Sequence, residues 1–136
     1  MSDATASTAG VLFVVLPTVM YGGVSLLRLI QKRDPGYVDN PVRQNLWRAG
    51  HAHAGVLLVL ALVAMRYMDD AGLDTGMETL ARTCLVAAPI LMPLGFFLSV
   101  ASPHATRPNG LISLTYVGAA ALAVGTVTIG VGLLTG

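Results

Sequence analysis

The sequence predicts an all-α fold, a four-helix transmembrane bundle in which residues 1–136 form one integral membrane domain. Apolar residues make up 54% of the chain and charged residues 11%, which is more apolar surface than a soluble domain of this size can bury. The surplus is expected to face the lipid bilayer. Apolar stretches of about the length that a membrane-crossing helix needs recur along the chain, and they place the spans at about residues 9–30, 46–68, 78–102 and 110–135.

The connection at residues 31–46 carries the clearest helix start. Asp39 or Asn40 can act as a capping residue, and Pro41 follows, which is a favoured residue in the first turn of a helix. The second helix is therefore expected to begin near Pro41, before its hydrophobic part. The first helix contains Pro17 and Gly22-Gly23, which membrane helices tolerate as kinks or points of close packing.

Three features mark the later helices. Glu78 and Arg82 are four residues apart, a spacing that favours an ion pair at the start of the third helix. Pro89 and Pro93 lie inside that helix and are expected to bend it, because each proline removes a backbone hydrogen bond. In the uncharged fourth span, glycines indicate where another helix can approach closely, at Gly118, Gly125, Gly130 and Gly132.

The distribution of basic residues predicts the orientation of the chain. The second connection is acidic, whereas basic residues lie in and beside the first and third connections, at Arg28, Lys32, Arg33, Arg43, Arg48 and Arg107. Because connections rich in Lys and Arg stay in the cytoplasm, connections 31–46 and 103–109 are expected there and both termini outside. Arg43 is interpreted as one of these anchoring charges. The three histidines, His51, His53 and His104, would then share the cytoplasmic side.

His51 and His53 lie in the stretch from Trp47 to Gly55, between small residues. Two residues apart on a helix, their side chains point about 200° from each other, so they cannot hold one metal ion together. One histidine can instead face the bundle while the other faces another helix, a second subunit or the lipid headgroups. With His104 and the neighbouring Arg48, they form the candidate functional site.

Three interpretations of this site stay open. In the first, the histidines are structural and bond to groups on adjacent helices. In the second, one of the pair, with His104, binds haem iron or a transition metal, for which neutral imidazole is a common ligand. In the third, Arg48 binds an anion and the histidines carry protons, so that an oligomer transports a small solute or protons.

Composition and motifs exclude several other functions. A net charge of +1 gives no field that would attract nucleic acid, and the single cysteine, Cys84, excludes an intramolecular disulfide. No catalytic triad, phosphate-binding glycine loop or intramembrane carboxylate is present, so an enzyme is not expected. The expected function is a non-enzymatic accessory or binding module that associates with itself or with a larger membrane complex through its glycine-bearing faces.

Two local resemblances concern the histidine stretch. The residues from Arg48 to Gly55, Arg-Ala-Gly-His-Ala-His-Ala-Gly, resemble a motif of small four-span bacterial membrane proteins of unassigned function, which implies the bacterial plasma membrane. His51-Ala52-His53 is similar to the His-x-His element of haem-copper oxidase subunit I. That resemblance implies that His51 and His53 are iron ligands, although the chain lacks the further copper-ligating histidines of that subunit.

Overall fold

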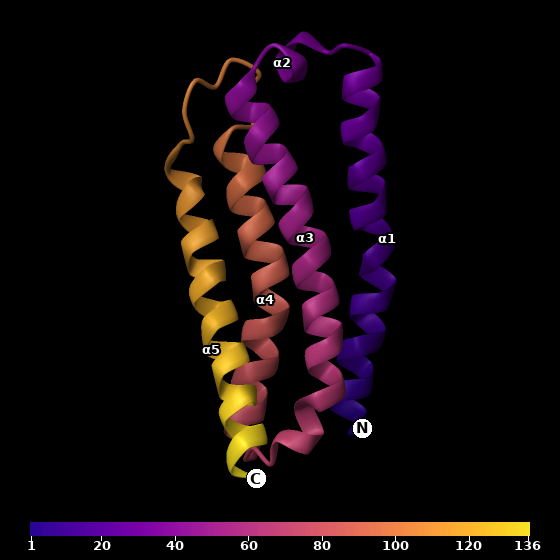
Figure 1. The fold of residues 1–136 in the computed structure, drawn as a ribbon, viewed down its shortest axis with the longest axis vertical. Helices are drawn as coiled ribbons and strands as arrows, with labels where there is room; N and C mark the ends of the chain where they lie inside the picture. The colour runs from indigo at the N-terminus through magenta and orange to yellow at the C-terminus, as the bar shows by residue number, and fades with distance from the viewer.

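The fold is all-α, as predicted. The computed structural model describes residues 1–136 and contains no strand (Figure 1). Four helices are long and apolar enough to cross a membrane, which is compatible with a small integral membrane protein. The elements in chain order are α1 (Asp3–Gln31), α2 (Pro35–Val38), α3 (Pro41–Met68), the 3₁₀ turn η1 (Asp69–Ala71), α4 (Thr75–Ser99), the 3₁₀ turn η2 (Gly110–Ile112) and α5 (Ser113–Thr135).

Capping residues determine where the helices begin. α3 starts at Pro41 as predicted, and the Asn40 side chain accepts a hydrogen bond from the amide of Arg43. α4 starts earlier than predicted because the Asp74 carboxylate accepts hydrogen bonds from two amides of its first turn. The predicted ion pair between Glu78 and Arg82 forms in that helix.

α4 lies between α3 and α5, whereas α1 packs mainly against α3 (Figure 1). The largest cluster of buried apolar side chains joins α3, α4 and η1 with one residue each from α1 and α5, and its members are Leu12, Leu58, Ala61, Met65, Met68, Ala71, Ala81, Leu85 and Ile129. Most of them lie in the half of the bundle nearer the chain termini. α1 therefore has fewer neighbours than the other long helices.

Glycines bring α5 close to α4 and η1. A Cβ atom at Gly118 would lie 2.8 Å from the amide nitrogen of Met92, and one at Gly125 would lie 3.1 Å from the carbonyl oxygen of Ala81. Gly132 makes a similar approach to η1. Three of the four predicted close approaches are thus confirmed, and they occur within the chain. At Gly130 a Cβ would have no neighbour within 4 Å, so the prediction is wrong there for contacts inside the chain.

The first and third connections meet at one end of the bundle. The side-chain amide of Asn40 donates hydrogen bonds to the carbonyl oxygens of Pro103 and Ala105, both at 3.0 Å. At the other end, where both termini lie, Ser2 and Thr5 donate to the carboxylate of Asp69 in η1 (Figure 1). The sequence predicted that the first and third connections lie at one end of the bundle and both termini at the other, and the structure agrees. Which end faces the cytoplasm stays a prediction.

Arg43 has a structural role that the sequence did not indicate. Its guanidinium donates to the carbonyl oxygens of Val100 and Ala101, just beyond the end of α4, and to that of Gly36 in α2. It also stacks on the ring of Trp47, with 3.9 Å between the guanidinium carbon and the ring centroid. One side chain thus fastens α2, α3 and the end of α4 together.

Tyr37 in α2 is completely buried at this junction, and its ring lies 6.1 Å from that of Trp47. Its hydroxyl has no hydrogen-bond partner. Burial raises the pKa of the Tyr37 hydroxyl above the ordinary 10, and the positive charge of Arg48 opposes that shift. The ring of Tyr37 therefore contributes apolar packing, while its buried hydroxyl loses its hydrogen bonds to water and gains none within the protein.

The glycine contacts predict opposite effects of alanine at two positions of α5. Gly125→Ala is expected to destabilise the fold by about 1–3 kcal/mol, because the methyl group overpacks the contact with α4. Gly130→Ala, the matched control, is expected to leave stability unchanged or slightly raised, because the space beside it is open. Reversible denaturation in detergent measures both, and equal effects would contradict the assigned packing.

The unpaired hydroxyl predicts that Tyr37→Phe is more stable than the natural protein by about 1 kcal/mol, since the substitution removes an uncompensated polar group. Tyr37→Ala is expected to lose about 3–5 kcal/mol because it also removes the packing. Tyr116→Phe is the control, because Tyr116 is 71% exposed.

The raised pKa of Tyr37 predicts a pH dependence as well. The folded state holds the phenolic proton more tightly than the unfolded state, so stability is unaffected by this group below pH 10 and falls as pH rises through the raised pKa. In Tyr37→Phe that part of the alkaline decline is expected to disappear. Denaturation midpoints measured at a series of alkaline pH values test this, and identical profiles for the two proteins would refute it.

Candidate functional site

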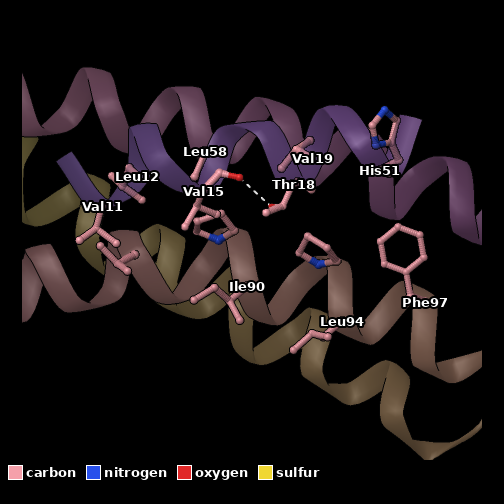
Figure 2. Close-up of a pocket in the computed structure, with 15 residues that line it drawn as sticks. Val11, Leu12, Val15, Thr18, Val19, His51, Leu58, Ile90, Leu94 and Phe97 are labelled. Atoms are coloured by element: carbon pink, nitrogen blue, oxygen red, sulfur yellow. Dashed lines mark hydrogen bonds between the residues drawn. The ribbon is translucent and has the colours of Figure 1, made fainter. Parts of the chain in front are cut away.

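A cavity of about 370 Å³ lies between α1, α3 and α4 (Figure 2). Its lining is mainly apolar and comprises Val11, Leu12, Val15, Thr18, Val19 and Gly22 of α1, His51, Ala54 and Leu58 of α3, and Val86, Pro89, Ile90, Pro93, Leu94 and Phe97 of α4. The cavity exists because α1 packs on α3 and leaves space between itself and α4. Figure 2 shows His51 and Phe97 at one end and Val11 and Leu12 at the other.

Two side chains of this lining are polar. The hydroxyl of Thr18 donates to the carbonyl oxygen of Val15 in its own helix, at 2.7 Å (Figure 2). The ring nitrogens of His51 form no hydrogen bond with the rest of the chain, in contrast to the ring of His53. His51 is therefore the side chain with free hydrogen-bonding capacity at this cavity.

Two glycines of α1 make room for the ring of His51. A Cβ atom at Gly23 would lie 3.0 Å from Nε2 of His51, and one at Gly22 would lie 3.5 Å from Nδ1. The imidazole thus lies against the α1 backbone, as the sequence indicated for these close-packing glycines. A side chain at Gly23 would press on the ring, so glycine is needed there for this close approach of α1 to His51.

His53 lies on a different side of α3. Its Nδ1 is 2.7 Å from the carbonyl oxygen of Ala49, and its ring centroid is 5.0 Å from that of Phe96 in α4. Because a carbonyl only accepts hydrogen bonds, Nδ1 carries the proton of this bond. The prediction that His51 and His53 face different surroundings is confirmed, and His53 does not line the cavity.

The other two predicted site residues are not at the cavity. His104 is exposed and lines a separate polar pocket between the first and third connections, together with Asp39 and Asn40. Arg48 is exposed and forms no ion pair. Its positive charge partly offsets the rise in the pKa of Tyr37 that burial causes. The structure therefore places one of the four predicted residues, His51, at the cavity.

The predicted site residues do not form a metal centre with several ligands. No three side chains of His, Cys, Asp or Glu come together in a group that could hold a metal ion. Among the residues that line the cavity, His51 is the only one of these types, so a metal ion there would have a single protein ligand.

Sequence reasoning missed the walls of the cavity. Pro89 and Pro93 stood out in the sequence only as helix-bending residues, and Phe97 carried no signal. Their role follows from the distance between α1 and α4, which periodicity and composition do not encode. Compared with protein-family models, with curated proteins and with solved structures, the chain matches none of them.

Proposed function

We propose that this chain is a small, non-enzymatic binding module of the bacterial plasma membrane, which holds a lipophilic molecule between α1, α3 and α4. The observation that carries the proposal is an apolar cavity of about 370 Å³ with one unpaired imidazole at its end. Small-molecule sites have volumes of roughly 300–1,000 Å³, apolar walls and a few placed polar groups. An oxygen atom of the ligand would form a hydrogen bond with a ring nitrogen of His51 at that end of the cavity.

The cavity walls support access from the bilayer. Val11 of α1 is 57% exposed and Ile90 of α4 is 53% exposed, although both line the cavity. In a membrane, these outer parts of the walls face lipid. A lipophilic molecule can therefore enter sideways between α1 and α4 without crossing the polar connections.

The basic residues of the first and third connections support the proposed orientation, with both termini outside. His51 would then lie near the cytoplasmic leaflet, about 4.5 Å in helix rise from Arg48. Self-association, or docking on a larger complex, is also part of the proposal. Gly130 supports it, because it is the glycine of α5 with an open face.

Binding can be measured through Trp47, the only tryptophan. Its ring lies 6.1 Å from that of Phe97, which lines the cavity beside His51. A bromine-labelled alkyl benzoquinone, a lipophile whose oxygens accept hydrogen bonds, is expected to quench Trp47 saturably in protein reconstituted into nanodiscs.

His51→Ala is expected to weaken this binding by up to about tenfold, because one hydrogen bond is lost. Gly23→Ala is expected to weaken it at least as much, because the new methyl group would lie 3.0 Å from Nε2 and displace the ring of His51. Gly10→Ala is the matched control on the same helix, since a Cβ there has no neighbour within 4 Å. Quenching that never saturates, or equal affinity in all four proteins, would overturn the proposed function.

A further inference from the structure

Two prolines of α4 line the cavity and interrupt the backbone hydrogen bonding of that helix. Pro89 and Pro93 lie inside the helix, and both line the cavity. A proline has no amide hydrogen, and its ring crowds the carbonyl group four residues earlier. The carbonyl oxygens of Leu85 and Pro89 therefore lose their helical hydrogen bonds, and each lies beside a proline ring that forms part of the cavity wall.

The side chains of the protein supply no donor to these two oxygens. The hydroxyl of Thr115, on the neighbouring helix, donates to the carbonyl oxygen of Met92, and that of Thr18 donates within α1. No side chain bonds to the carbonyl oxygen of Leu85 or Pro89. In an apolar environment an unpaired carbonyl is costly, and membrane proteins usually provide such groups with a partner.

The depth of these carbonyl oxygens in the bilayer restricts which molecules can donate a hydrogen bond to them. The centre of α4 is residue 87, so Pro89 lies about 3 Å from the middle of the helix. At that depth in a bilayer, lipid chains offer no donor. A molecule that occupies the cavity can supply the donor.

We infer that the bound lipophile carries a hydroxyl group that donates a hydrogen bond to the carbonyl oxygen of Leu85 or Pro89. This inference rests on the proposed function, because it specifies the class of ligand for the same cavity. The ligand class is a membrane-soluble alcohol or phenol, with one oxygen at His51 and a hydroxyl directed at α4. A hydrocarbon chain, or a molecule whose oxygens only accept hydrogen bonds, would leave both carbonyls unpaired.

The test compares two probes of nearly the same shape. The bromine-labelled alkyl benzoquinone only accepts hydrogen bonds, whereas its hydroquinone also donates them. Kept reduced in the absence of oxygen, the hydroquinone is expected to bind about 5–10-fold more tightly than the quinone, which corresponds to one additional hydrogen bond. Saturable quenching of Trp47 measures both affinities.

Alanine at the prolines provides the decisive variants. Pro89→Ala and Pro93→Ala, singly and together, return an amide donor to the carbonyl of Leu85 or Pro89, so the preference for the hydroquinone over the quinone is expected to fall below about twofold in the double variant. Pro17→Ala is the matched control, because Pro17 is a helical proline of α1 that does not line the cavity. It is expected to retain the full preference.

The outcomes separate the two proposals. If the quinone does not bind saturably to the natural protein, the proposed function fails. If the quinone binds but the hydroquinone binds no more tightly, the cavity is a binding site and the hydroxyl inference is wrong. A preference that survives both proline substitutions, or that disappears in Pro17→Ala as well, also overturns the inference. The single variants decide the question if the double variant does not fold.

Discussion

The need to pair every backbone polar group within the chain underlies this structure. In a bilayer no water reaches the helix interiors, so a spanning segment must satisfy its own amides and carbonyls. Of the 108 backbone hydrogen bonds, 93 lie within helices, and side chains serve many of the groups at the helix ends. Asn40 and Arg43 donate to carbonyls of the third connection, and Asp74 accepts from amides of α4. Pro89 and Pro93 depart from this pattern, because neither has an amide hydrogen to donate, and both line the cavity.

Helix packing explains why the cavity is where it is. Gly118, Gly125 and Gly132 let α5 approach α4 and η1 at backbone distance, so α4 is tightly held on that side. α1 has no comparable contact with α4, and it meets α3 through Gly22 and Gly23, against His51. The space between α1 and α4 is the consequence. Gly22 and Gly23 thus let α1 lie on α3 beside the imidazole, at one end of the cavity.

The sequence predicted the features that follow from local chemistry. Four apolar stretches gave the all-α class, the Asn-Pro pair gave the start of α3, and the spacing of His51 and His53 gave their different directions. The pairing of the first and third connections at one end followed from counting the spans.

What the sequence could not predict depends on contacts between distant segments. His104 was grouped with the other histidines because it shares their end of the bundle, but the hydrogen bonds from Asn40 to Pro103 and Ala105 hold the third connection over the first. Arg43 looked like an anchoring charge, and its carbonyl partners near residue 100 are more than 50 positions away along the chain. Neither the periodicity of the apolar residues nor their composition carries that information.

The histidine pair shows how a structural and a functional interpretation can apply to neighbouring residues. His53 uses Nδ1 on the carbonyl of Ala49 and packs on Phe96, so its ring is held by its own helix and by α4. His51, turned toward α1, has glycine backbone against its ring and no partner for either nitrogen. His51 is half-buried, and both of its ring nitrogens stay free to bond to a molecule in the cavity. The free nitrogens of His51 support the proposed lipophile with a polar head, and the prolines of α4 support the proposed hydroxyl group on it.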